Sequence, residues 1–168
     1  MGTLLVQLAR NTGARVVALA SSERKLATAR ALGADVVINY SDRDWPLRVR
    51  AAAGEVDVVF DGVGGDIGLA AFALLGPGGR FCPFGMASGS FAPVSPELAR
   101  ERQVTVVRSQ PQGAEDLRRM AEAALAEATA GRIRPVIGQE FTLAQAADAH
   151  AAIESRETTG KTLLQASR

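Results

Sequence analysis

Short runs of β-branched and other apolar residues alternate along the chain with longer segments whose apolar positions recur every three or four residues. The first pattern predicts buried strands and the second predicts amphipathic helices. Strands are expected at residues 16–20, 36–39, 56–61, 80–84 and 104–108. Helices are expected at residues 3–11, 23–32, 44–53, 67–75 and 115–130. This repeated strand-then-helix order is typical of a doubly wound, Rossmann-like parallel sheet, which is an α/β fold.

Glycines stand where these helices are expected to stop, and the clearest stop is the turn Gly76-Pro77-Gly78-Gly79. Beyond Gly131 the pattern changes to a short strand near 135–137, a helix near 143–154 and a last strand near 161–165. We therefore predict two units, a main domain at residues 1–133 and a short αβ tail at residues 134–168.

Composition and charge exclude several classes of partner and site. The formal net charge is +1 and the arginines are scattered, so no nucleic-acid partner is expected. No stretch approaches the ~20 apolar residues of a membrane span. A single cysteine, Cys82, forms no internal disulfide, and with the single histidine, His150, it assembles no Cys/His zinc site. We expect a cytoplasmic protein without a metal ion.

In a sheet of this kind, ligands bind beyond the carboxyl ends of the strands. An acidic residue at the end of a strand in this position usually selects NAD, but Ala20 ends the first expected strand, 16–20, here. The donors and positive charge of Ser21, Ser22, Arg24 and Lys25 suit a 2′-phosphate, which favours NADP over NAD. The alternative is that Ser22 only caps the next helix while Arg24 and Lys25 are solvated surface charges.

Two glycine motifs are weaker candidates for phosphate loops. The fingerprint G-x-G-x-x-G is absent, and the nearest string, Gly62-Val63-Gly64-Gly65-Asp66-Ile67-Gly68, has the wrong last spacing. It still predicts a tight turn where the backbone approaches a ligand. The string Thr159-Gly160-Lys161-Thr162 resembles a Walker loop, but Ser155 stands where its first glycine belongs and a strand is expected to follow. A nucleotide triphosphatase is therefore not favoured.

Single polar residues add no catalyst. His150 lies in an alanine-rich helix and is interpreted as a packed or surface residue, and Cys82 is interpreted as an inert thiol within an apolar strand. Neither a Ser/His/Asp arrangement nor a close pair of carboxylates is evident, so hydrolysis has no support. We assign no catalytic side chain.

Four longer segments carry a resemblance to a known family: GTLLVQLARNTGARVVALASSERKLATARALGADVVINY, VDVVFDGVGG, GGRFCPFGMASG and ESRETTGKTLL. Over nearly its whole length the chain resembles the medium-chain dehydrogenase/reductase superfamily, and within it the zinc-independent quinone-oxidoreductase branch. The resemblance implies NADPH as cofactor and hydride transfer to a small-molecule substrate, namely a quinone, an activated alkene or a ketone.

The resemblance also implies which residues bind the cofactor. Gly2 matches the last glycine of the family's phosphate loop. The positions that surround the adenosine 2′-phosphate match Ser21, Ser22, Lys25, Tyr40 and Arg156. The positions beside the nicotinamide ribose and ring match Gly62, Val63, Phe84, Gly85 and Met86, and Met86 replaces the asparagine that is frequent there.

Family members carry earlier residues that form a substrate domain, the central first strand and two further loop glycines. We therefore expect a truncated fragment whose tail would pack on the substrate domain and whose sheet falls into two halves. Each buried amide left unpaired at their edges would cost about 1–3 kcal/mol.

Two function hypotheses follow. The first is an NADPH-dependent oxidoreductase, and the second is a non-catalytic remnant or a dimerising binding module of the same fold. The resemblance and the unpaired edge expected at 104–108 predict a homodimer through that strand. The alternative is that Arg108 and a covering loop keep this edge solvated and the chain monomeric.

Overall fold

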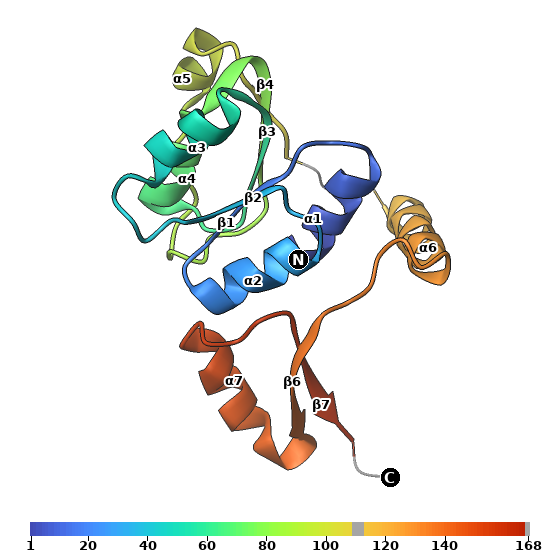
Figure 1. Cartoon of the computed structure of the whole chain (residues 1–168). Helices are drawn as coiled ribbons and strands as arrows, with labels where there is room; N and C mark the ends of the chain where they lie inside the picture. The colour runs from blue at the N-terminus through green and yellow to red at the C-terminus, as the bar shows by residue number, and fades with distance from the viewer. Residues whose placement is uncertain (109–112, 167–168) are drawn as a thin grey trace.

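The computed structural model describes residues 1–108 and 113–166, and strands alternate with helices along them (Figure 1). The strands are β1 (Val17–Ala20), β2 (Val36–Asn39), β3 (Val56–Asp61), β4 (Leu75–Pro83), β5 (Thr105–Val106), β6 (Ile137–Thr142) and β7 (Lys161–Gln165). The helices are α1 (Gly2–Asn11), α2 (Glu23–Ala31), α3 (Trp45–Ala53), α4 (Gly65–Phe72), α5 (Pro96–Glu101), α6 (Ala114–Thr129), the short 3-10 helix η1 (Leu143–Gln145) and α7 (Ala146–Glu154). The α/β class and the strand-then-helix order are confirmed.

All strand pairs are parallel, and they form three sheets in the described residues: β1-β2, β3-β4-β5 and β6-β7. The main domain therefore contains two half-sheets, as expected from the sequence. The carboxyl ends of β1 and β2 lie in register, since Ala20 is opposite Asn39. Asp61 at the end of β3 is likewise opposite Pro83 of β4.

The two half-sheets share an apolar core. One cluster joins Ile38 of β2 and Trp45 of α3 to Leu74, which follows α4. A second cluster lies over β3-β4-β5, where Phe72 and Phe81 meet edge to face with ring centroids 5.5 Å apart. Burial of these large side chains stabilises each by about 1.5–3 kcal/mol relative to exposure. Packing between helices and strands thus holds the halves together.

A hydrogen-bonded turn between α2 and β2 closes the β1-β2 half. The Asp35 carboxylate accepts a hydrogen bond of 2.8 Å from the Val16 backbone N–H and one of 3.1 Å from Arg10. The backbone hydrogen bond from Val16 is the main reason that the pKa of Asp35 lies below its ordinary value, and the Arg10 charge acts in the same direction. Gly33, at a φ of +100°, supplies the left-handed backbone on which α2 ends.

β4 begins earlier than predicted, because the glycine turn lies inside it. The register moves from Val56 opposite Leu75 to Val58 opposite Arg80, so the residues between Leu75 and Arg80 form a bulge. Gly78 has a φ of +82° and donates its N–H to the Gln103 carbonyl at 2.8 Å. The string 76–79 is therefore a bulge anchored to the next crossover.

Further elements differ from the sequence prediction: β5 covers only Thr105–Val106 of the expected 104–108, and α4 is Gly65–Phe72 where 67–75 was expected. α5 was not predicted, because its six residues are too few for helical periodicity; the Ser95 hydroxyl accepts the Leu98 N–H at 3.1 Å and caps it. β6 starts at Ile137 and continues to Thr142, whereas the strand was expected near 135–137. Gly138 allows this strand to approach β7, because a Cβ there would lie 1.6 Å from the Thr159 carbonyl oxygen.

The β6-α7-β7 unit lies beside α2 (Figure 1) and is joined to α1 by polar contacts at its start. The buried Gln7 side chain accepts the Arg134 N–H at 2.9 Å and donates to the Arg134 carbonyl at 3.0 Å. Asn11 donates to the Arg132 carbonyl at 2.8 Å. The unit boundary at 133/134 stays a prediction, and residues 109–112 and 167–168 of the predicted units lie outside the described residues.

α6 stands to one side of the molecule (Figure 1) and buries none of its residues. Its exposed apolar side chains include Leu117, Met120 and Leu125. Among the described helices, none is long and apolar enough to span a membrane.

Candidate functional site

A cavity of about 450 Å3 lies where β1 ends and α2 begins. The loop after β1 and the first turn of α2 provide one wall, and the turn between α7 and β7 provides the other. The lining residues are Ser21, Ser22, Arg24, Lys25, Arg156 and Glu157. Five of these six residues are predicted site residues, brought together across more than 130 positions of sequence.

Hydrogen bonds join the two walls of this cavity. The Lys25 ammonium donates to the Arg156 carbonyl at 2.7 Å, and the Arg24 guanidinium donates to the Glu157 carbonyl. Arg156 has a φ of +61°, a conformation that non-glycine residues rarely adopt. Arg24 and Lys25 therefore both donate to the tail backbone, while the Arg24 side chain stays exposed and Lys25 is half-buried. Ser22 stands at the N-cap position of α2, but its side chain makes no capping hydrogen bond.

The cavity is electropositive. Partial burial is the main cause that lowers the pKa of Lys25, and the neighbouring charges of Arg24 and Arg156 lower that pKa further. Three cations from two segments thus converge, with Glu157 as the one acidic residue in the lining. Clustered cations of this kind fit an anion, and arginine and lysine are the side chains that bind phosphate.

Two other predicted residues lie outside this lining. Tyr40 follows β2, and its N–H donates to the Ala20 carbonyl at 3.1 Å, which places its backbone next to Ser21. Its side chain packs against the apolar cluster of the first half-sheet. Gly2 begins α1 and is exposed. The structure therefore places the Tyr40 backbone beside the end of β1, and neither Tyr40 nor Gly2 lines the cavity.

The second group of predicted residues meets at the carboxyl ends of β3 and β4. Phe84 donates its N–H to the Asp61 carbonyl at 2.8 Å, and the Val63 carbonyl accepts the Ser88 N–H at 2.8 Å. A Cβ on Gly62 would lie 2.8 Å from the Phe84 ring, and a Cβ on Gly85 would lie 2.8 Å from the Gly62 carbonyl oxygen. Both glycines are thus required for the close approach of the two loops.

Met86 and Phe84 are exposed at this edge, with 54% and 40% of their surface accessible. The Met86 carbonyl accepts the Gly89 N–H at 2.8 Å, which folds the loop back on itself. This group presents backbone and apolar surface and carries no charge. It fits a flat uncharged ring better than a phosphate.

Asp61 organises the turn and was not predicted as a site residue. It is 5% exposed, and its Oδ1 accepts the N–H groups of Val63 and Gly64, each at 2.9 Å. Its Oδ2 is buried without a hydrogen-bond partner in the described residues, and a Cβ on Gly68 would lie 2.3 Å from it. An aspartate that ends an apolar strand directly before a glycine turn was the available signal.

The two groups occupy different half-sheets, and no described hydrogen bond joins them. Both lie at carboxyl ends of parallel strands, which is where ligands bind in such folds. An elongated ligand with a phosphate at one end and a flat ring at the other fits this arrangement.

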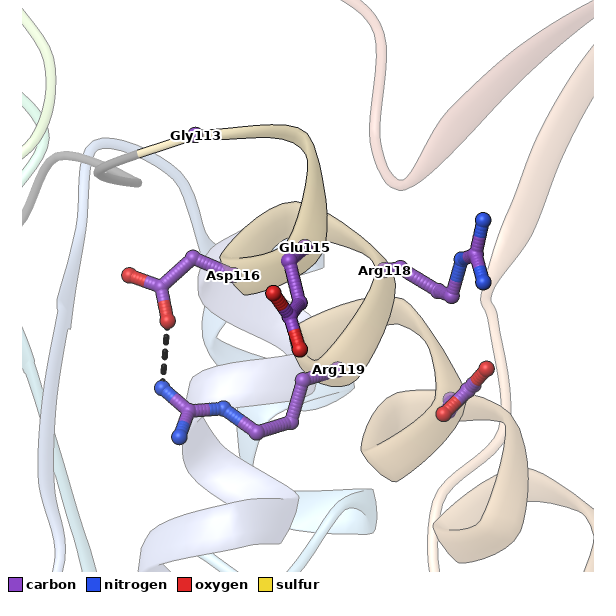
Figure 2. A pocket seen from close by; sticks show the side chains of 6 residues that line it. Gly113, Glu115, Asp116, Arg118 and Arg119 are labelled. Carbon is purple, nitrogen blue, oxygen red and sulfur yellow. Dashed lines mark hydrogen bonds and ion pairs between the residues drawn. The ribbon is translucent and has the colours of Figure 1, made fainter.

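A larger cavity of about 680 Å3 lies along the first turns of α6 and contains none of the predicted site residues. Its lining residues are Gly113, Glu115, Asp116, Arg118, Arg119 and Glu122. Figure 2 shows Asp116 paired with Arg119, while Arg118 is directed away from that pair. Acidic and basic side chains alternate here on an exposed helix, so size alone does not make this cavity the candidate site.

Cys82 and His150 were expected to have no catalytic role, and neither is among the residues that line the two cavities. Burial raises the pKa of the Cys82 thiol, which favours the unreactive protonated form. His150 is exposed on α7. The strand expected after the Thr159-Gly160 pair is observed as β7, which keeps that string from being a Walker loop.

Comparison with known proteins identifies the family. A family model described as zinc-binding dehydrogenase matches residues 32–164. Quinone oxidoreductase-like protein 2 of Bos taurus is 34% identical over 171 residues, which cover 97% of this chain and 49% of that protein. The chain thus spans about half the length of the curated relatives it matches.

Solved structures agree with this assignment. A mycobacterial protein complexed with NADPH superposes with a TM-score of 0.86 at 32% identity, covering 98% of this chain and 53% of that one. An NAD-dependent alcohol dehydrogenase superposes with a TM-score of 0.84 at 34% identity, covering 97% of this chain and 47% of that one.

The zinc of the family description does not fit the residues at hand. Within residues 1–108 and 113–166, no group of three or more His, Cys, Asp or Glu side chains could hold a metal ion. The match rests instead on the cofactor-binding fold and its relatives. The chain belongs to the zinc-binding dehydrogenase family, in the medium-chain dehydrogenase/reductase superfamily, with quinone oxidoreductases among its relatives.

Proposed function

We propose that this chain binds NADPH as the cofactor-binding half of an oxidoreductase of quinone-reductase type. One observation carries the proposal: the cationic cavity formed by Arg24 and Lys25 of α2 with Arg156 of the tail. Such a cavity suits the 2′-phosphate, which distinguishes NADPH from NADH. Ala20 supports the same choice, because it cannot accept hydrogen bonds from ribose hydroxyls as an acidic side chain would.

The other residues position the two ends of the cofactor. Ser21 and Ser22 offer hydroxyl donors beside the cations. The Tyr40 backbone is bonded to the Ala20 carbonyl next to them. At the other end, the loops 62–65 and 84–90 provide the backbone surface for the nicotinamide ring and its ribose. The Asp61 carboxylate holds the first of these loops through the N–H groups of Val63 and Gly64.

The bound cofactor supplies a hydride, that is, a proton with two electrons, and a second proton from solvent completes reduction of the acceptor. We propose a quinone, an activated alkene or a ketone as acceptor and assign no catalytic side chain. Relatives support this range, since they include quinone oxidoreductases and a 2-haloacrylate reductase of Burkholderia sp.. Consumption of NADPH in the presence of each acceptor class, measured by absorbance, distinguishes them.

The fold alone does not choose between cofactors, because one similar structure carries NADPH and another is an NAD-dependent enzyme. The choice rests on the cavity residues. We expect NADPH to bind more tightly than NADH, and we expect Lys25→Ala to reduce this difference in affinity. Loss of the charge-assisted contacts to the 2′-phosphate should weaken the binding free energy of NADPH by roughly 1.5–3 kcal/mol.

Arg30→Ala is the matched control, because Arg30 lies on the same helix, is exposed and pairs with Glu23 outside the cavity. Calorimetric titration of the three proteins with both cofactors measures the effect. Equal affinity of the unsubstituted chain for NADPH and NADH would contradict the proposal.

The second candidate is a non-catalytic binding module that dimerises through residues 104–108. The observation that favours it is the edge position of β5, which pairs with β4 on one side while no described strand covers the other. The Val107 N–H donates to the Phe81 carbonyl at 2.8 Å, so the N–H of Val106 faces away from β4. The alternative is a solvated edge next to Arg108 and a monomeric chain.

Mass in solution with and without Val106→Pro tests this dimer, because proline removes the outward donor and leaves the bond of Val107 in place. We expect a dimer that dissociates on substitution. A monomer, or a dimer indifferent to the proline, would show that this edge is not the interface. The cytoplasmic location expected from cysteine usage also stays a proposal.

A further inference from the structure

Among the residues that the structure describes, hydrogen bonds attach the tail to the main domain at only two places. One is the Gln7–Arg134 contact at its start. The other is the cavity, where Lys25 and Arg24 donate to the carbonyls of Arg156 and Glu157. The cavity is therefore also the junction between α2 and the β6-α7-β7 unit.

This junction has spare hydrogen-bonding capacity and unbalanced charge. A lysine ammonium has three donors and an arginine guanidinium has five, and each uses one on a tail carbonyl. Lys25 and Arg156 carry like charges on the two sides of the junction, and the Arg156 charge disfavours the charged form of Lys25. A phosphate would accept from the remaining donors and offset the repulsion, since it carries about −1.5 to −2 charges at neutral pH.

We propose that a 2′-phosphate bound in this cavity fastens the tail onto α2, so that cofactor binding and tail docking are coupled. The coupling rests on the proposed function of the same site. It is reciprocal, because a ligand that stabilises the docked tail must bind more tightly when the tail is docked. An adenosine nucleotide without the 2′-phosphate lacks the group that bridges the cations, and leaves the tail unaffected.

Amide hydrogen exchange of the full chain tests this coupling with 2′,5′-ADP and 5′-ADP as probes. With 2′,5′-ADP at ten times its Kd, exchange in residues 134–166 that proceeds through undocking slows by up to about tenfold. Exchange in residues 56–83, which hold β3 and β4, stays unchanged and serves as the internal reference. With 5′-ADP at the same fractional occupancy, exchange in the tail does not change.

Arg156→Gly is the informative variant. Glycine keeps the left-handed backbone that aims the Arg156 carbonyl at Lys25, and it removes the cation of the tail. We expect at least about tenfold weaker binding of 2′,5′-ADP and loss of the tail protection at equal occupancy. Lys161→Ala, which removes a tail cation outside the cavity, leaves both unchanged.

The outcomes separate the coupling from the proposed function. Failure of 2′,5′-ADP to bind overturns the proposed function and the coupling with it. Binding without slower exchange in the tail overturns the coupling alone, as does equal protection by 5′-ADP. Protection that survives Arg156→Gly shows that the tail cation is not the fastener and also overturns the coupling.

Discussion

The main domain and the tail are built from the same strand-then-helix pattern, yet they bury very different amounts of apolar surface. Around β3-β4-β5, Phe72, Leu75 and Phe81 are at most 2% exposed. In the tail, Leu163 and Leu164 of β7 remain 39% and 43% exposed. The same periodicity thus yields a packed core in one region and a thin layer in the other.

The comparison shows that strand and helix formation and stability have separate causes. β6 and β7 pair over their full length although none of their residues is buried. The tail is instead joined to the rest of the chain by polar contacts of Gln7, Arg24 and Lys25. We therefore expect the attachment of the tail to change when charged side chains are replaced or a charged ligand binds. We expect the stability of the core to change when the volume of its buried side chains is changed.

The largest effect is expected in the core. Phe81→Ala removes a fully buried ring and its contact with Phe72, and should lower the free energy of unfolding by about 3–5 kcal/mol. Leu164→Ala in the tail should lower it by less than about 1 kcal/mol, because that side chain is half exposed. Urea unfolding measures the free energy of unfolding of both variants. Equal losses in the two variants would contradict the contrast between core and tail.

The glycine turn beside the core provides a second contrast. Gly64 has a φ of +75°, and a Cβ there would lie 2.0 Å from the Ser90 carbonyl oxygen. Gly54 has a similar φ of +72° but open space around it. We expect Gly64→Ala to be more destabilising than Gly54→Ala by about 1–3 kcal/mol, because backbone must move to admit the methyl group. Similar unfolding midpoints for the two variants would show that the loop at 88–90 yields freely.

The contacts of Gln7 are expected to matter for the tail and less for the core. Gln7→Ala removes both hydrogen bonds to Arg134 and leaves backbone groups unpaired, at a cost of about 1–2 kcal/mol. Limited proteolysis should therefore cut the tail faster. Asn11→Ala, which removes one exposed bond to Arg132, should have a smaller effect. Cleavage that is unchanged in Gln7→Ala would show that the tail is held elsewhere.

The smallest effect is a dependence on pH. The pKa of Asp35 is lowered in the folded state, chiefly by the Val16 N–H, so its carboxylate stabilises the fold above its ordinary pKa of about 3.9. This contribution is lost as the pH falls through the lowered value. Asp35→Asn should therefore flatten the fall in stability on acidification, as followed by urea midpoints at decreasing pH.

Glu127 is the control for that measurement. Its hydrogen bond with Arg132 also lowers its pKa, but it lies on α6, which buries no residue. Glu127→Gln should leave the acid dependence of global unfolding unchanged. A flatter profile for Glu127→Gln than for Asp35→Asn would contradict the assignment of the acid-sensitive contribution to the Asp35–Val16 hydrogen bond.

Much of the fold could be predicted from the sequence because periodicity and punctuation are local signals. The strands at 36–39 and 56–61 have the predicted bounds, and α2 and α3 differ by one residue at an end. α5 and the bulge at 76–79 could not be predicted, since the first depends on the Ser95 cap and the second on the bond between Gly78 and Gln103. Both are set by specific hydrogen bonds and not by periodicity.

The candidate site was predictable to the extent that its residues follow a strand. Ser21 to Lys25 stand out because no acidic residue ends β1. Arg156 was reached through family resemblance, since nothing local links it to Lys25 across 131 positions. Glu157 and the tail carbonyls were missed, because a backbone acceptor leaves no trace in residue type. The buried carboxylate of Asp61 was missed because its role depends on the turn that follows it.

A crystal structure of the chain with 2′,5′-ADP tests the central claim most directly. The account predicts the 2′-phosphate in the cavity after β1, within hydrogen-bonding distance of the Lys25 ammonium and of the Arg24 or Arg156 guanidinium. A nucleotide bound along α6, in the larger cavity of Figure 2, would contradict it. A nucleotide bound after β1 with its 2′-phosphate turned into solvent would contradict it equally.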